Sequence, residues 1–177
     1  LCTAWETLEL NSVARAWLRG ASTISEIDVV RLYVYTDGRG GSQQVGKERS
    51  PAWSFAVFAS DASMNQAVVG YTGRAAETSE QLPWHAGITA DNSYAMEITA
   101  MTCALLWLAQ DAVCSGVPAA ICFDSTAAAS AAQGITLAGE QIGVLIAPPL
   151  ALAAQQRRLL DWHHVHAHED HPLNEMV

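Results

Sequence analysis

The pattern of hydrophobic residues along this chain predicts five strands, and the first three lie in its first half. Residues 29–38, VVRLYVYTDG, are rich in β-branched and aromatic residues and end in Asp-Gly, which predicts a strand that runs into a turn. Residues 52–59 and 66–76 have a similar character, and the polar stretch SDASMN between them predicts a hairpin. The glycine-rich segment 38–51 is expected to be a loop.

The second half of the chain alternates between helical and strand patterns. Residues 92–113 are apolar at helical spacing and can be capped by Asn92 or Ser93, so a helix is expected there. A short apolar run at 119–124 predicts a buried strand, and an alanine-rich helix should follow at 125–133.

A further helix, a strand and one more helix are expected in the last part of the chain. Pro149 is expected to open a helix at 149–160, residues 161–168 predict the last strand, and Pro172 begins the last helix. Three strands followed by alternating helices and strands predict an α/β layered domain with a mixed sheet.

The length and composition fit one globular domain with a flank. The chain has 177 residues, of which 50% are hydrophobic and 15% charged. Apolar residues at roughly helical spacing predict a flanking helix in residues 1–20, which glycine ends, and a linker up to residue 28. We therefore expect a flank at 1–28 and a domain at 29–177.

The charge and the cysteines restrict the classes of partner and compartment. Nine Lys and Arg against 18 Asp and Glu give a net charge of −9. This charge argues against a protein that binds nucleic acid through its overall electrostatic attraction. Any such contact must be local or assisted by another domain. The four cysteines show no CxxC spacing, and a disulfide framework would be denser in cysteines. This favours a reducing, intracellular compartment and leaves nucleus or cytoplasm open. No apolar run reaches about 18 residues, so no membrane partner is expected.

Three acidic residues stand where acids are poorly tolerated without a purpose. Asp37 ends an apolar strand, Glu97 lies in the first turns of an apolar helix, and Asp124 ends the strand AAICF. A buried carboxylate without a partner costs several kcal/mol or is forced to become neutral. Acids at two strand ends and on a helix packed against the sheet can converge, and convergent carboxylates bind hard cations such as magnesium or manganese.

Four ordered motifs carry a resemblance to a known family. They are YTDG, YAMEITAMTCAL, CFDSTAAA and HVHAHEDHPLNE. They resemble the motifs of type 1 ribonuclease H domains, over about residues 29–177. The spacing from Asp37 to Glu97 is long for the family, and the extra length falls in the loops 38–51 and 77–91. The length and the flanking helix are similar to those of a ribonuclease H module in a retroelement polyprotein.

The resemblance implies a fold, a reaction and a set of site residues. The fold would be a mixed five-stranded sheet with helices on both faces. The reaction would be hydrolysis of the RNA strand of an RNA–DNA hybrid with two Mg²⁺ ions, or Mn²⁺, held by Asp37, Glu97 and Asp124. His168 would handle protons or assist product release. Contacts with the hybrid backbone are expected from Gly38, Ser93 and Ser125.

The family also has a fourth carboxylate after the Asn-Glu pair, and in this chain it would be the next residue after Val177. We therefore expect the chain to be a fragment of a larger polyprotein, cut just before that acid and nearly inactive with magnesium.

Three alternatives stay open. One is a non-catalytic connection or spacer domain, which the net charge and the missing acid favour. A second is another nuclease or integrase with the same fold. The third is a zinc site in the closing histidine run, since residues 164, 166 and 168 would share one face of a strand.

Overall fold

The computed structural model places the five predicted strands in one sheet. It describes residues 29–41, 50–75, 93–110, 116–136 and 142–166. The predicted flank at 1–28 and the helix expected from Pro172 lie outside these ranges, so both stay predictions. No helix among the described residues is both long enough and apolar enough to cross a membrane.

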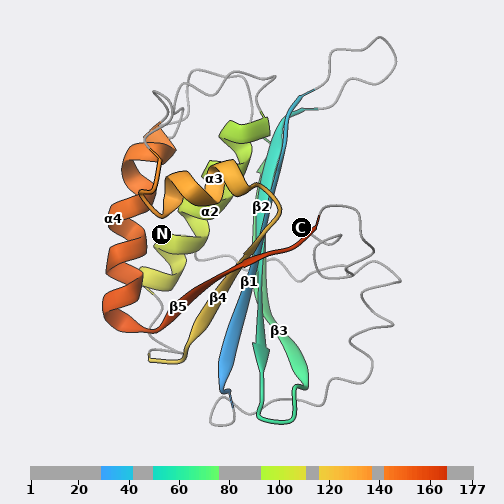
Figure 1. Cartoon of the computed structure of the whole chain (residues 1–177). Coiled ribbons are helices and arrows are strands. Elements are labelled where there is room, and N and C mark those ends of the chain that lie inside the picture. The colour runs from blue at the N-terminus through green and yellow to red at the C-terminus, as the bar shows by residue number, and fades with distance from the viewer. Residues whose placement is uncertain (1–28, 42–49, 76–92, 111–115, 137–141, 167–177) are drawn as a thin grey trace.

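The sheet is mixed, and its centre is formed by two parallel strands. The strands are β1 (Arg31–Arg39), β2 (Ala52–Ser60), β3 (Gln66–Ala75), β4 (Ala119–Phe123) and β5 (Leu160–His164). Their order is β3-β2-β1-β4-β5, with β1 antiparallel to β2, β2 antiparallel to β3, and β4 parallel to both β1 and β5 (Figure 1). The mixed five-stranded sheet is confirmed. Because β1, β4 and β5 are parallel, their carboxyl ends lie at one edge of the sheet.

The connection between β2 and β3 is the predicted hairpin. One carboxylate oxygen of Asp61 accepts hydrogen bonds from the backbone N–H groups of Ser63, at 2.8 Å, and Asn65, at 2.9 Å. Met64 takes a positive φ of 64°. Asp61 therefore acts as the acceptor that closes the turn, as short acidic side chains often do.

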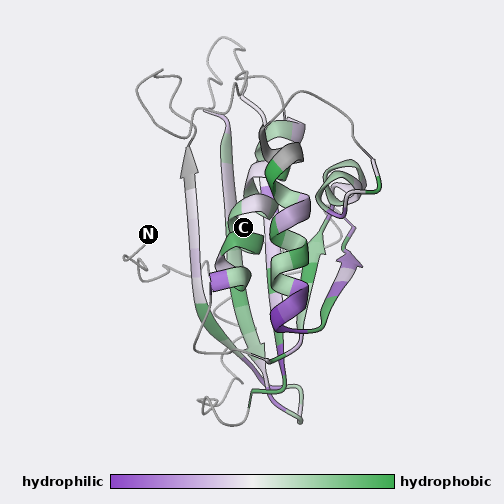
Figure 2. Cartoon of the chain, turned by 90° about the vertical axis from the view of Figure 1, so that its left-hand side faces the viewer, coloured by the Kyte–Doolittle hydropathy of each residue, from purple (hydrophilic) through white to green (hydrophobic). Residues whose placement is uncertain are grey.

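Three helices cover one face of the sheet (Figure 1). They are α2 (Ser93–Gln110), α3 (Thr126–Ala132) and α4 (Ile142–Arg157). A core cluster joins them to the strands, and in it Leu32, Val57, Leu105 and Leu108 are fully buried. Many of the buried helix residues are alanines, so the helices can approach one another and the sheet closely. Figure 2 shows this helical layer from its outer side, where hydrophobic residues are frequent along the helices.

The second face of the sheet carries a smaller buried cluster. Its buried members are Tyr35, Ala56, Phe58, Ala120 and Cys122. The Tyr35 and Phe58 rings pack edge to face, with centroids 5.7 Å apart. All the helices that the structure describes lie on the first face. A helix on the second face, which the resemblance implies, stays a prediction, because the chain after His166 lies outside the described residues.

Two predicted boundaries are wrong. Helix α4 begins at Ile142 and contains Pro148 and Pro149, whereas the sequence suggested a start at Pro149. Proline lacks a backbone N–H but has a helical φ, so an apolar segment that buries Ala147 can extend the helix in front of it. The strand predicted at 161–168 ends at His164, because its partner β4 ends at Phe123 and offers no further residues to pair with.

Candidate metal and active site

Asp37 and Asp124 come to the same edge of the sheet through the pairing of β1 with β4. The parallel register runs from Leu32 opposite Ala119 to Tyr35 opposite Cys122, so two residues further each strand reaches its acid. Thr36, fully buried beside Asp37, donates its hydroxyl to the Cys122 carbonyl at 3.4 Å. Both acids are half-buried. The two carboxylates therefore face the same region at the carboxyl ends of the central strands.

Glu97 reaches this region from helix α2. The helix packs on β1 so closely that a Cβ atom at Gly38 would lie 2.1 Å from the Glu97 backbone nitrogen and 2.3 Å from the Met96 carbonyl carbon. Both distances are shorter than any real contact, so only glycine fits at position 38. The Glu97 side chain is only 7% exposed. The residue after Asp37 thus sets how near Glu97 comes to the sheet.

The three carboxylates converge as the sequence predicts. One oxygen from each of Asp37, Glu97 and Asp124 can be chosen so that all three lie within 4.8 Å of one another. Within the described part of the chain, these acids form the only group of three His, Cys, Asp or Glu side chains that could hold a metal ion. The geometric half of the expectation is confirmed, and the chemical role of each acid stays a prediction.

The electrostatics of this group disfavour three free charges. Burial, and then the neighbouring charges of Asp124 and Asp37, raise the pKa of Glu97 to about 9 from its usual 4.5, although a hydrogen bond from the Gly38 backbone acts in the opposite direction. Without a cation, Glu97 is therefore protonated at neutral pH.

The same site contains buried oxygens that lack hydrogen-bond partners. These are Oε2 of Glu97 and Oδ1 of Asp124. Buried polar atoms in proteins are nearly always satisfied, so such oxygens point to a ligand that supplies positive charge. Carboxylate oxygens at this spacing suit hard divalent cations such as Mg²⁺ or Mn²⁺. The donor set, the repulsion at Glu97 and the unpaired oxygens all fit one or more such ions.

The other predicted site residues have different surroundings. Ser125 is the N-cap of α3, where its hydroxyl accepts a hydrogen bond from the Ala128 N–H at 3.4 Å. Ser93 is the exposed first residue of α2, one helical turn before Glu97. Gly38 lies directly under Glu97. His168 lies outside the described residues, so its predicted role is untested.

Sequence reasoning did not connect His164 with this site. Its ring Nε2 lies 3.2 Å from the backbone carbonyl oxygen of Asp124, and its ring packs on Phe123 with centroids 5.7 Å apart. The contact follows from the register of β4 and β5, in which Phe123 lies opposite His164. Predicting this neighbour would have required the strand order and the register together.

Comparison with known proteins finds likeness in structure and none in sequence. No protein-family description matches the chain, and no curated protein matches it by sequence. The N-terminal ribonuclease H domain of Rv2228c from Mycobacterium tuberculosis, solved as a fusion with maltose-binding protein, is similar with a TM-score of 0.51 and 14% identity. The match covers 84% of this chain and 91% of that one.

A second solved structure gives the same result. LC11-RNase H1 in complex with an RNA/DNA hybrid is similar with a TM-score of 0.51 and 17% identity, over 82% of this chain and 93% of that one. The chain has the ribonuclease H fold. At such low identity the likeness concerns the fold, and the chemistry must be argued from the residues of this chain. In this ribonuclease H-type fold, the three acids lie at the carboxyl ends of the two central parallel strands and on the helix that crosses them.

Proposed function

We propose that this chain is a metal-dependent nuclease that hydrolyses the RNA strand of RNA–DNA hybrids. The observation that carries the proposal is the convergence of Asp37, Glu97 and Asp124 from three different elements, with ligand oxygens within 4.8 Å of one another. The fold supports it, because one similar structure was solved with an RNA/DNA hybrid bound. An origin in a retroelement polyprotein, with further domains as partners, remains a prediction of the sequence.

The three acids would act together as the ligands of two Mg²⁺ ions, with Mn²⁺ as a substitute. Such ions, when bound, activate a water and stabilise the leaving oxygen of an in-line displacement at phosphorus. By the resemblance to ribonuclease H domains, Asp37 would serve both ions. The low exposure of Glu97 keeps water away from its carboxyl group, so the charge that it gains when a cation displaces its proton would interact with that cation rather than with solvent.

Residues around the acids would position the hybrid. Ser93 and Ser125 carry hydroxyl groups next to Glu97 and Asp124, and the hybrid's phosphates and 2′-hydroxyls accept or donate hydrogen bonds of that kind. Gly38, which the resemblance also implies as a contact, is buried under Glu97, so its part would be to let α2 approach Asp37. His168 would handle protons near the site, as the sequence suggests.

The test is a cleavage assay with an end-labelled RNA–DNA hybrid, run with excess protein and with either Mg²⁺ or Mn²⁺. We expect slow cutting of the RNA strand, which the excess of protein makes detectable, and we expect Asp37→Asn to lower the rate by orders of magnitude, because one ligand loses its charge. Asp61→Asn is the matched control, because it makes the same charge change in the β2–β3 turn. Single-stranded RNA, duplex RNA and duplex DNA serve as competing substrates.

Two results would contradict the proposal. One is the absence of RNA cleavage in the hybrid with both ions, which would favour a non-catalytic domain of the same fold. The other is an equal loss of activity in Asp37→Asn and Asp61→Asn, which would mean that the convergent acids have no special role in the reaction.

A further inference from the structure

The histidine run at the end of β5 brings the imidazole rings of His164 and His166 together, outside the acid site. His164 is the last residue of β5, and the Val165 N–H donates to the Phe123 carbonyl at 2.7 Å, which holds the next residue in place. His164 and His166 are alternate residues, and their ring centroids lie 4.9 Å apart at an interplanar angle of 73°. Both side chains are exposed, so a solute ion can reach them.

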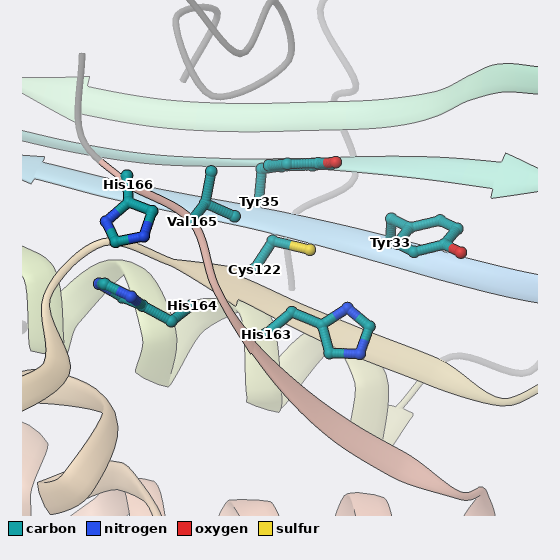
Figure 3. A pocket seen from close by; sticks show the side chains of 7 residues that line it. All are labelled: Tyr33, Tyr35, Cys122, His163, His164, Val165 and His166. Carbon is teal, nitrogen blue, oxygen red and sulfur yellow. The ribbon is translucent and has the colours of Figure 1, made fainter. Parts of the chain in front are cut away.

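Figure 3 shows these rings beside each other at one end of a pocket of about 420 Å³, whereas the His163 side chain points the other way. Cys122 also lines this pocket. Its side chain is buried, and Figure 3 shows its sulfur pointing away from the two rings. The two histidines are therefore the available nitrogen donors at this end.

The surroundings of His164 select one tautomer. Its Nε2 lies 3.2 Å from the Asp124 carbonyl oxygen, which can only accept a hydrogen bond, so Nε2 carries the proton. The neutral ring then has its lone pair on Nδ1. Metal-binding histidines typically donate their second ring N–H to a backbone carbonyl or a carboxylate, and this contact fixes the ring. The Phe123 ring, with its centroid 5.7 Å away, supports the same orientation.

The ring separation matches two imidazoles on a single ion. A metal–nitrogen distance of about 2.0–2.1 Å puts each ring centroid about 3.2 Å from the ion. Two such rings are then about 4.5 Å apart at a right angle and about 5.2 Å apart at a tetrahedral angle. The observed 4.9 Å lies between these values.

We propose that His164 and His166 form a second metal site, which binds a nitrogen-preferring divalent transition ion such as Zn²⁺ or Ni²⁺ and leaves its other positions to water. Imidazole suits these ions, whereas Mg²⁺ takes oxygen ligands, so Mg²⁺ does not compete for the histidine site. Metal binding at His164 and His166 does not require that the chain be a nuclease. It is joined to the acid site through the hydrogen bond from His164 to the Asp124 backbone.

The experiment is a calorimetric titration of the full chain with Ni²⁺ in the presence of millimolar Mg²⁺. We expect His166→Ala and His164→Ala each to weaken Ni²⁺ binding by roughly tenfold or more, since even the loss of an outer partner of a ligand costs that much. His163→Ala is the matched control, because it removes a neighbouring exposed histidine that points away. Asp37→Asn shows how much of the Ni²⁺ binding belongs to the acid site, and His163→Ala should keep the affinity of the unchanged protein.

A second measurement does not depend on how the variants fold. Paramagnetic Ni²⁺ should broaden the ring proton resonances of His164 and His166 in the unchanged protein at lower concentrations than those of His163. The proposal is overturned if His166→Ala binds Ni²⁺ as tightly as the unchanged protein, or if His163→Ala weakens binding as much as His166→Ala does. Uniform broadening of all histidine resonances would also overturn it.

Discussion

Replacing Glu97 with glutamine should stabilise the metal-free protein at neutral pH. Burial and the charges of Asp124 and Asp37 raise the pKa of Glu97 to about 9, from 4.5 for an ordinary glutamate. The folded state therefore holds the Glu97 proton more tightly than the unfolded state does. It follows that the contribution of Glu97 to stability is fully present below about pH 4.5 and is lost as the pH rises toward 9. Glutamine, which stays neutral, has no such loss.

The size of the effect follows from the width of this window. Each pH unit inside it changes the free energy of unfolding by up to about 1.4 kcal/mol. Between pH 5 and pH 7.5, the unchanged protein should therefore lose up to about 3 kcal/mol relative to Glu97→Gln. All groups other than residue 97 are the same in the two proteins, so their contributions cancel in the difference.

The assay is urea denaturation in EDTA at several pH values from 5 to 8, with the free energy of unfolding plotted for both proteins. Saturating Mg²⁺ should reduce the difference, because a bound cation stabilises the ionised carboxylate. Asp61→Asn is the control variant, because it removes a carboxylate outside the acid site. Hydrogen bonding, chiefly from the Asn65 side chain, lowers the pKa of Asp61 below 3.8, so its contribution is lost only at more acidic pH. Parallel curves for the unchanged protein and Glu97→Gln would refute the reasoning.

Two further predictions concern residues next to the acids, and denaturation measures both. Gly38→Ala should lower the free energy of unfolding by about 1–3 kcal/mol, because its Cβ would lie 2.1 Å from the Glu97 nitrogen and α2 must move; unchanged stability would mean that the helix can retreat freely. Ser125→Ala should lower the free energy of unfolding by about 1 kcal/mol, because α3 loses its N-cap. Ser125→Asn should keep most of that stability, because asparagine can also cap a helix. Equal losses in the two variants would contradict a capping role.

Local patterns were sufficient to predict the strands and to single out the three acids as candidates for one site. Strand β4 is a continuous apolar run, and all five of its residues are buried between β1 and β5. Glu97 was identifiable because it is an acid in an otherwise apolar stretch of helix. Asp37 and Asp124 were identifiable because the first lies near the carboxyl end of apolar strand β1 and the second directly follows β4. Their convergence could be anticipated because the carboxyl ends of parallel strands share an edge.

The features that the sequence did not reveal depend on contacts between distant segments. Gly38 looks like an ordinary turn glycine until the approach of α2 is known. The end of β5 is set by the end of its partner β4, which no local pattern in β5 contains. Helix α4 starts before its prolines, and Ala147, directly in front of them, is fully buried, so tertiary burial outweighs the usual meaning of proline there.

The core explains how the fold tolerates an acid that it would otherwise expel. Leu105 and Leu108, further along α2, are fully buried against the sheet and the other helices, so the helix cannot move outward to hydrate Glu97. Gly38 has no side chain, and a Cβ atom there would keep the helix away from β1. Apolar burial at one end of α2 thus holds a carboxyl group near two others at the opposite end, at a cost in stability. A divalent cation relieves that cost by neutralising the group. Ion binding is therefore expected to stabilise the fold more as the pH rises toward 9, since more of the Glu97 charge must then be accommodated.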